Sequence, residues 1–172
     1  RRNHVALAEL IKNAYDADAT EVTLKFSNAR QKKDEVSEIQ VIDDGVGMTP
    51  DEIQENWMRI ATTDKVRNPT SDVYGREKTG EKGIGRFACR RLADRLKLES
   101  TAYDEDDEVY KRTTVTFNWE DFAREEDIDS IPVDAEVEVL EEAETGVTLH
   151  LKELKDQWNQ QDFNTLRRNV IT

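Results

Sequence analysis

The chain has 172 residues, of which 37% are charged and 36% hydrophobic, which suits one domain with a single core and a heavily charged surface. A formal net charge of −13 argues against nucleic-acid binding by the domain as a whole, because phosphate contacts need clustered Lys and Arg. The single cysteine excludes an internal disulfide. The sequence shows neither a signal-peptide pattern nor an apolar stretch of about 20 residues, so we expect a cytoplasmic protein without membrane contact.

The sequence begins inside a predicted helix that has no clear N-terminal cap between Arg1 and His4, so we expect a fragment that lacks an upstream helix. Glu9, Asn13 and Asp16 have the spacing i, i+4 and i+7 and share one polar face of this helix. The opposite face is apolar and consists of Leu7, Leu10, Ile11, Ala14 and Tyr15. Taken alone, this pattern indicates an ordinary amphipathic helix with its charges in water.

Two strands are predicted next. Residues 20–26 alternate with Val22, Leu24 and Phe26 inward, and a polar loop over 27–37 leads to a strand over 39–43. Asp43 falls on the apolar face of this strand and Asp44 on the other face. A carboxylate that follows a buried stripe needs a donor, and the exocyclic amine of a purine is one candidate.

Glycines follow that strand directly. Gly45 and Gly47 allow a tight turn and the close approach of a flat ring to the backbone. The alternative is a plain turn, since Asp-Gly is a common turn pair. Thr49 and Glu52 then form a capping-box pattern with Pro at the first helical position, which predicts a helix that buries Ile53, Trp57 and Ile60.

A long loop is predicted over 61–79, where no period is sustained. It ends in the spacing G-x-x-G-x-G over 80–85, and the next residues continue as a helix with Ala88, Leu92 and Leu96 on one side. Free amides and the positive end of a helix dipole suit phosphate oxygens. The pattern is not the Rossmann fingerprint, whose spacing is G-x-G-x-x-G directly after a strand. It is not a P-loop either, because the pair Gly75 and Gly80 is followed by Glu81 instead of Lys. Cys89 in this helix is expected to be a small buried thiol.

The later part of the chain predicts strands and a closing helix. Strands are expected over 96–101, 108–119, 135–141 and 145–151, and a helix over 157–170. Acidic runs at 104–108 and 120–144 are typical of solvated loops and edges. The basic run over 82–97, with Arg86, Arg90, Arg91 and Arg95, is either a partner surface or a salt-bridged helix face.

Together these segments resemble the GHKL ATPase superfamily, the Bergerat-fold proteins related to histidine kinases, DNA gyrase B and heat-shock chaperones. The run from Glu9 to Thr20 is similar to the family's N-box, 41–48 to its G1 box and 80–85 to its G2 box, while 145–151 resembles its late threonine-bearing strand. The form of these motifs is most similar to MutL, MORC and chaperone-type members. The resemblance covers nearly the whole chain.

The resemblance implies a role for each motif. Glu9 would be the general base that orients water, Asn13 the ligand of a Mg²⁺, and Asp43 the acceptor of the adenine amine. Asp16 would brace the site and Asp44 would face outward. The residues implied to contact nucleotide are Asn13, Asp43, Gly45, Gly47, Met48, Thr62, Lys65, Gly80, Lys82, Gly83, Ile84, Gly85, Arg86 and Thr145. For Lys82 and Arg86 a solvated charge at the helix start is an equal alternative.

We therefore predict an α+β two-layer sandwich, with helices on one face of a mostly antiparallel mixed sheet. The resemblance implies Mg²⁺-dependent binding and slow hydrolysis of ATP, a lid over about 61–82, and a nucleotide-dependent homodimer in the full-length protein with an unidentified client. The expected domain is 1–156, and 157–172 would lead into a following domain. The alternatives are a histidine-kinase-type catalytic domain, or a nucleotide-gated interaction module without significant turnover.

Overall fold

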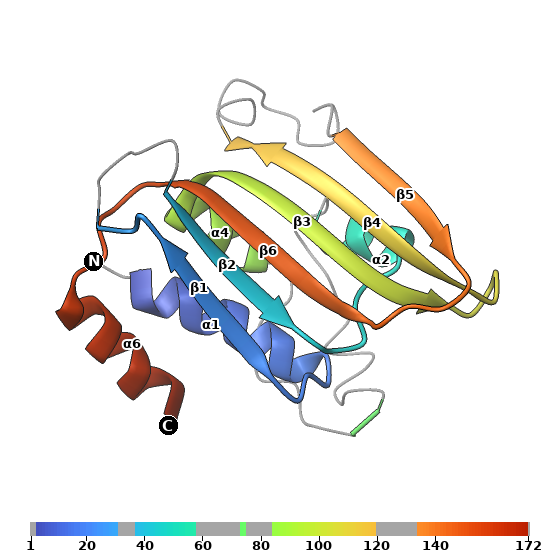
Figure 1. The fold of residues 1–172 in the computed structure, drawn as a ribbon, viewed down its shortest axis with the longest axis horizontal. Helices are drawn as coiled ribbons and strands as arrows, with labels where there is room; N and C mark the ends of the chain where they lie inside the picture. The colour runs from blue at the N-terminus through green and yellow to red at the C-terminus, as the bar shows by residue number, and fades with distance from the viewer. Residues whose placement is uncertain (1–2, 31–36, 58–72, 75–83, 120–133, 172) are drawn as a thin grey trace.

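The structure is a computed structural model, which describes residues 3–30, 37–57, 73–74, 84–119 and 134–171. In these ranges a six-stranded sheet carries its helices on one face (Figure 1). The strand order is β1-β2-β6-β3-β4-β5, and each neighbouring pair of described strands is antiparallel. The predicted α+β two-layer sandwich is confirmed, with a sheet that is antiparallel throughout its described strands.

The described helices are α1 (Asn3–Asp16), α2 (Pro50–Trp57), α4 (Ile84–Leu92) and α6 (Gln160–Ile171). The strands are β1 (Val22–Ser27), β2 (Glu38–Asp43), β3 (Ala93–Asp104), β4 (Val109–Asn118), β5 (Asp134–Leu140) and β6 (Gly146–Leu154).

Alternation along the strands gives the sheet an inner and an outer face. Ile39 and Val41 of β2, with Leu149 and Leu151 of β6, face the helices and are at most 5% exposed. Because successive side chains of a strand point to opposite faces, His150 lies on the outer face, where it contacts Glu38 at 3.0 Å. The outer face is thus polar and carries ion pairs, and the core lies between the inner face and the helices.

Helix α1 buries Ala6, Leu7, Leu10 and Ala14 against this core. The prediction that Tyr15 belongs to the same buried face is wrong, since its side chain is 45% exposed. At about 100° per residue, position 15 lies at the margin of the apolar stripe and points past the core.

The sequence also predicts that the helix after the glycine loop extends to Leu96, and the structure corrects this. Helix α4 ends at Leu92, and β3 begins at the next residue. Leu96 and Arg95 are therefore strand residues, with Leu96 fully buried and Arg95 paired with Glu153 at 3.4 Å. Pairing of β3 with β6 and β4 decides this boundary, because the spacing of Ala88, Leu92 and Leu96 suits a helix equally well.

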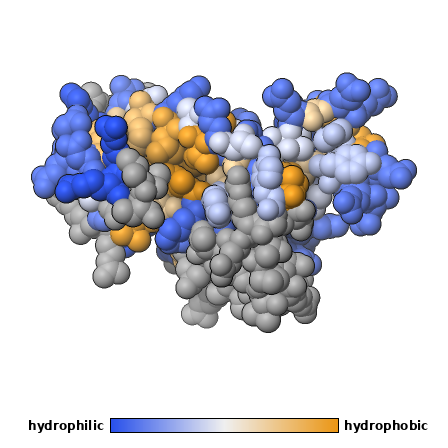
Figure 2. All heavy atoms as spheres, turned by 90° about the horizontal axis from the view of Figure 1, so that it is seen from below, coloured by the Kyte–Doolittle hydropathy of each residue, from blue (hydrophilic) through white to orange (hydrophobic). Residues whose placement is uncertain are grey.

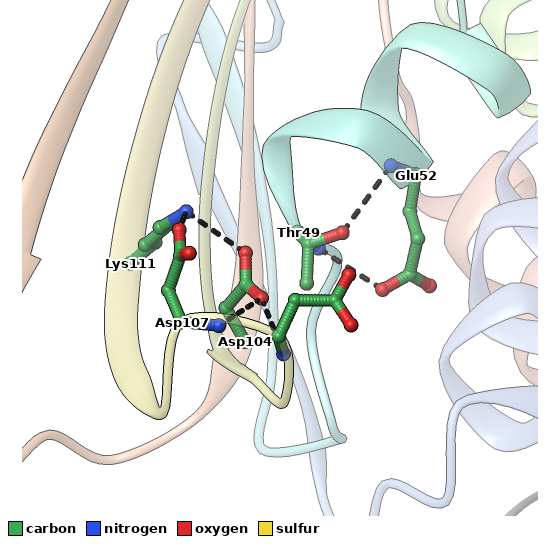
Figure 3. A network of polar contacts seen from close by, with 6 residues as sticks. Thr49, Glu52, Asp104, Asp107 and Lys111 are labelled. Atoms are coloured by element: carbon green, nitrogen blue, oxygen red, sulfur yellow. Dashed lines mark hydrogen bonds and ion pairs between the residues drawn. The ribbon is translucent and has the colours of Figure 1, made fainter.

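The capping box at the start of α2 is confirmed (Figure 3). The Thr49 amide donates to the Glu52 carboxylate at 3.2 Å, and the Glu52 amide donates to the Thr49 hydroxyl at 3.3 Å. Two helix N-H groups that would lack partners are satisfied in this way. Ile53 and Trp57 are buried as predicted, and Ile60 lies outside the described residues.

Helix α6 packs on the same core. Trp158 and Leu166 are at most 5% exposed, and Phe26 of β1 contacts both Trp158 and Phe163, with ring centroids 5.4 and 4.8 Å away. Asn159 and Asp162 cap the helix through reciprocal hydrogen bonds of 2.8 and 3.0 Å. Helix α6 therefore packs on this core through Phe163 and Leu166, and a following domain stays a prediction.

Figure 2 shows the molecule from below, with hydrophilic residues at both ends and hydrophobic residues gathered between them. Among the described helices, none combines the length and apolarity that a membrane crossing requires.

Candidate functional site

The turn after β2 is fixed to three other segments of the chain. The Val46 amide donates to the Ala17 carbonyl at 2.8 Å, just beyond the end of α1. The Thr145 hydroxyl donates to the Gly45 carbonyl at 2.7 Å. The Ser100 hydroxyl on β3 accepts from the Met48 amide at 2.7 Å and donates to the Met48 carbonyl at 3.1 Å. This turn over 45–48, which we call the base turn, is therefore held from both sides.

Glycine is required within the base turn. Gly47 has a φ of 70°, and a Cβ at this position would lie 2.1 Å from the Thr101 carbonyl oxygen. A Cβ at Gly45 would lie 2.5 Å from the Ala17 carbonyl oxygen. Both obstacles are backbone atoms, so the turn approaches β3 and α1 as closely as only glycine allows.

Asp43 faces inward beside the base turn, as predicted. One carboxylate oxygen accepts from the Gly45 amide at 2.9 Å and from the Val147 amide at 3.3 Å. Burial raises the pKa of Asp43, and the two amides and the nearby Asp44 charge modify this shift. The carboxylate is thus held in one orientation and has acceptor capacity left for a donor in the site.

Asp44 faces outward, as predicted, and has a structural function. It accepts from the amides of Thr20 and Glu21 at 2.7 and 2.9 Å and also from the Thr20 hydroxyl. These hydrogen bonds lower the pKa of Asp44, with the Thr20 hydroxyl as the main cause. Two adjacent carboxylates therefore belong to different environments, and only Asp43 is available to the inner side.

Asn13 and Gly85 are close to each other although they are far apart in sequence. A Cβ on Gly85 would lie 2.9 Å from the Asn13 amide nitrogen and 3.3 Å from the Trp57 ring. Helices α1, α2 and α4 thus meet at the first turn of α4, which we call the α4 start. The first turn of a helix has amides without intrahelical partners and provides the positive end of a helix dipole.

Helix α1 joins the two places. Asn13 contacts the α4 start, and Ala17, about 6 Å further along the helix, holds the base turn through its carbonyl. Glu9 lies one turn before Asn13 and forms an ion pair with Lys12 at 3.3 Å. A partly exposed pair of this kind contributes at most about 1 kcal/mol, so it does not lock the carboxylate.

Arg86 is neither solvated nor spread on the surface. Its side chain is 4% exposed, and Nη1 donates to the Trp57 carbonyl at the end of α2 at 2.9 Å. Burial lowers the pKa of Arg86, and the Arg90 charge adds to this shift. Nη2 is buried and has no hydrogen-bond partner among the described residues. The alternative of a solvated charge is wrong, and a phosphate contact stays a prediction.

Several predicted site residues lie outside the described ranges: Thr62, Lys65, Gly80, Lys82 and Gly83. Ile84 is described only as the first residue of α4. Sequence reasoning missed Ser100 and Lys12, and nothing in the local pattern singles out Ser100, because its function depends on a partner 52 residues away. Cys89 is fully buried as predicted, and burial raises the pKa of its thiol.

A hollow of about 540 Å³ opens on the outer face, where Thr23, Ile42, Thr148 and Glu99 stand in one row across four strands. Its other carboxylates are Glu21, Asp43, Asp44 and Glu144, and Arg112 and Thr145 line it as well, so it reaches the edge of the base turn. So many carboxylates disfavour an anionic ligand. The base turn and the α4 start on the inner side are the better candidate for nucleotide.

Comparison with known proteins decides the family. Residues 2–147 match the model of the histidine kinase-, DNA gyrase B- and HSP90-like ATPases. The chain belongs to this ATPase family. Its members bind and hydrolyse ATP.

Two curated relatives of this ATPase domain illustrate the range of the family. The chaperone protein HtpG of Oceanobacillus iheyensis is 28% identical over 94% of this chain and 26% of its own length. The DNA mismatch repair protein MutL of Lacticaseibacillus casei is 33% identical over 56% of this chain and 13% of its own length. The chain thus spans about a quarter or less of the length of these relatives.

A solved structure supports the fold. The ATPase region of Saccharomyces cerevisiae topoisomerase II, bound to ICRF-187, matches with a TM-score of 0.57 and 13% identity, over 96% of this chain and 43% of that one. At this identity the likeness concerns the fold alone.

The residues of this ATPase domain fit a magnesium ion that is held largely by substrate. Among the described residues no group of three or more His, Cys, Asp or Glu side chains could hold a metal. Mg²⁺ commonly keeps several waters and binds through one or two protein oxygens plus phosphates. Asn13, against the α4 start, is suitably placed to be such a single ligand.

Proposed function

We propose that this chain binds Mg²⁺-ATP between α1, the base turn and the α4 start, and hydrolyses it slowly to ADP and phosphate. The observation that carries the proposal is the last turn of α1, which contacts the α4 start through Asn13 and holds the base turn beside Asp43 through Ala17. The segment 13–17 thus connects the side-chain amide proposed for the metal, on Asn13, with the turn beside the acceptor proposed for the purine amine, Asp43.

In this proposal, different residues contact the adenine, the phosphates and the metal. Asp43 accepts the adenine amine, with its oxygen held by the Gly45 and Val147 amides. Gly47 lets the base approach the backbone, and the α4 start donates N-H groups to phosphate oxygens. Mg²⁺, held by Asn13, would neutralise charge on the phosphates.

Hydrolysis needs an oriented water. Glu9 lies one helical turn from Asn13, so its carboxylate can accept a hydrogen bond from the water that attacks the γ-phosphorus. The new P-O bond forms to this water, whose proton passes to the Glu9 carboxylate, while the bond to the β,γ-bridging oxygen breaks, and ADP and phosphate leave. Positioning and charge neutralisation provide most of the acceleration in such reactions. Binding of Mg²⁺-ATP also drives lid closure and dimerisation of the full-length protein in this proposal.

Binding is tested by calorimetric titration of ATP and ADP, with and without Mg²⁺, on the unaltered chain and on Asp43→Asn. Asparagine can keep the acceptor oxygen toward Gly45 and Val147 but turns an N-H₂ toward the adenine amine, so affinity should fall at least about thirtyfold. Asp44→Asn is the matched control, because it removes an adjacent charge that faces outward. Equal affinities for all three proteins would reject the assigned adenine site.

Turnover is tested separately with Glu9→Ala. We expect ATP affinity to stay within about threefold while phosphate release falls about a hundredfold or more, because the group acts on water and not on the ground state. Sedimentation of the full-length protein that carries the same substitution, with and without ATP, tests the dimer. A Glu9→Ala protein that hydrolyses ATP at the original rate would eliminate Glu9 as the base.

A further inference from the structure

Asp18, just after α1, has a conformation that suits glycine better. Its φ is 62°. The next residue ends the helix, because the Ala19 amide donates to the Ala14 carbonyl at 3.1 Å. A left-handed residue after a helix is usually glycine, since other side chains are strained there. Asp18 nevertheless occupies this position, and it is only 4% exposed. Its buried carboxylate therefore needs an explanation other than helix termination.

The carboxylate of Asp18 accepts two backbone hydrogen bonds from a distant turn. The Val73 amide donates to Oδ2 at 2.7 Å and the Tyr74 amide donates to Oδ1 at 3.1 Å. The side chains of these two residues are 62% and 56% exposed, so their own packing does little to hold the turn. Hydrogen bonds to a charged acceptor are about twice as strong as neutral ones. One buried side chain thus fixes Val73 and Tyr74 to the end of α1.

We propose that Asp18 is a positioning residue, which fixes the Val73–Tyr74 turn to α1 and thereby slows the dissociation of bound nucleotide. This inference rests on the proposed function, because α1 is the helix that joins the α4 start to the base turn. Asp18 follows directly on Ala17, whose carbonyl holds Val46. Val73 and Tyr74 are thus tied to α1 at the residue next to the one that holds the base turn.

Two substitutions separate this function from helix termination. Asp18→Gly removes both acceptor oxygens and relieves the left-handed backbone, so the fold should be kept or stabilised. Asp18→Asn keeps one acceptor oxygen and tolerates the left-handed region. If Asp18 served only to end α1, glycine would stabilise the fold and change nothing else. If Asp18 anchors the turn, glycine would remove the hydrogen bonds that hold Val73 and Tyr74.

Asp104→Asn is the matched control. Asp104 likewise accepts two backbone amides, from Asp106 and Asp107 at 3.0 and 3.3 Å, but it lies at the start of the β3–β4 hairpin (Figure 3). A general effect of losing an amide-binding carboxylate would appear in this variant as well.

The anchor is measured by amide hydrogen exchange of Val73 and Tyr74 in the nucleotide-free chain. We expect exchange at least tenfold faster in Asp18→Gly, an intermediate rate in Asp18→Asn, and no change in Asp104→Asn. Unchanged exchange in Asp18→Gly would overturn the anchor.

The effect on nucleotide is measured by stopped-flow dissociation of a fluorescent methylanthraniloyl ATP in Mg²⁺. Dissociation should be at least threefold faster from Asp18→Gly, at an unfolding midpoint equal to or above that of the unaltered chain. An unchanged dissociation rate together with faster exchange would overturn the positioning role. If the unaltered chain bound no nucleotide, the proposed function and the effect on dissociation would both be rejected, while the exchange result would still decide whether Asp18 holds the turn.

Discussion

The base turn and the α4 start are built in different ways. At the base turn, main-chain groups make the decisive contacts: Gly47 lies against the Thr101 carbonyl, and Val46 donates to Ala17. At the α4 start, the closest neighbours of Gly85 are the ends of side chains, from Asn13 and Trp57. A backbone contact cannot give way without moving a strand, whereas a side chain can change rotamer. The base turn should therefore tolerate substitution less well than the α4 start.

The two ends also differ in charge. Beside the base turn lies the Asp43 carboxylate, one oxygen of which accepts from the Gly45 amide. The α4 start combines helix amides with the buried guanidinium of Arg86. A neutral donor such as an aromatic amine suits the first environment, and phosphate oxygens suit the second. In the proposed function this difference would orient the nucleotide, with the base near β2 and the phosphates near α4.

The largest effect is expected from Gly47→Ala. A Cβ 2.1 Å from the Thr101 carbonyl oxygen requires a backbone shift, and the φ of 70° adds strain. Strain at such a φ costs about 1–3 kcal/mol, and overpacking adds about 1–3 kcal/mol. Urea unfolding should therefore show a loss of about 2–6 kcal/mol, a large fraction of a typical domain's stability. A loss below about 0.5 kcal/mol would contradict the rigid base turn.

Gly85→Ala should act on binding more than on stability. Alanine improves helix propensity by about 1 kcal/mol, which offsets a shift of Asn13 and a tight contact to Trp57. Because Asn13 is displaced, affinity for Mg²⁺-ATP should fall about tenfold, or about 1.4 kcal/mol. Calorimetry and urea unfolding measure the two effects.

A double-mutant cycle makes this second test specific. If Gly85→Ala acts through Asn13, the variant with both Gly85→Ala and Asn13→Ala should bind no more weakly than Asn13→Ala alone. Additive losses of affinity would instead mean that the added methyl group blocks the nucleotide directly, and the contact between Asn13 and the α4 start would have no functional part.

The pH dependence of binding should follow Asp43. Burial raises the pKa of its carboxyl above 3.8, so the ionised acceptor is lost at a pH where an exposed aspartate is still charged. Affinity for ATP should therefore weaken as pH falls toward the raised pKa, by up to about tenfold per pH unit below it. Titration of ATP between pH 7.5 and 4.5, at about half-unit steps, measures this effect.

The same group has the opposite effect on the stability of the nucleotide-free chain. A raised pKa means that the fold favours protonated Asp43, so its stabilising contribution is full below 3.8 and is lost as pH rises through the folded-state value. Asp43→Asn should remove both trends, whereas Asp44→Asn should leave the binding trend in place. A pH profile that survives in Asp43→Asn would assign the titration to another group.

Much of this architecture could be predicted from local sequence. Alternation identified the strand that ends in Asp43, and the Thr49 and Glu52 pattern identified the start of α2. The inward orientation of Asp43 and the outward orientation of Asp44 followed from the same period of two. These features depend on neighbours in the sequence, which is why they were accessible.

Features that depend on residues far away in the sequence could not be predicted from local sequence. The boundary between α4 and β3 is set by pairing with β6, the burial of Arg86 by the end of α2, and the function of Ser100 by the base turn. The carboxylate of Asp18 accepts from residues 55 and 56 positions away. Local periodicity carries no information about such contacts. Local sequence therefore predicts candidate residues but not the contacts that fix them.

The smallest effect is expected from Thr145→Val. Valine keeps the shape of threonine but removes the hydrogen bond to the Gly45 carbonyl, at 2.7 Å, so the base turn should lose about 1 kcal/mol. Because Val46 and Met48 remain held by Ala17 and Ser100, affinity for ATP should fall only about two- to fivefold. Thr145→Ser should restore it, and Thr148→Val, three residues along on the outer face, should have no effect. A loss of ATP affinity larger than that of Gly85→Ala would mean that the Thr145 hydroxyl contacts the nucleotide itself. Binding at the base turn would then depend on a side chain as much as binding at the α4 start does.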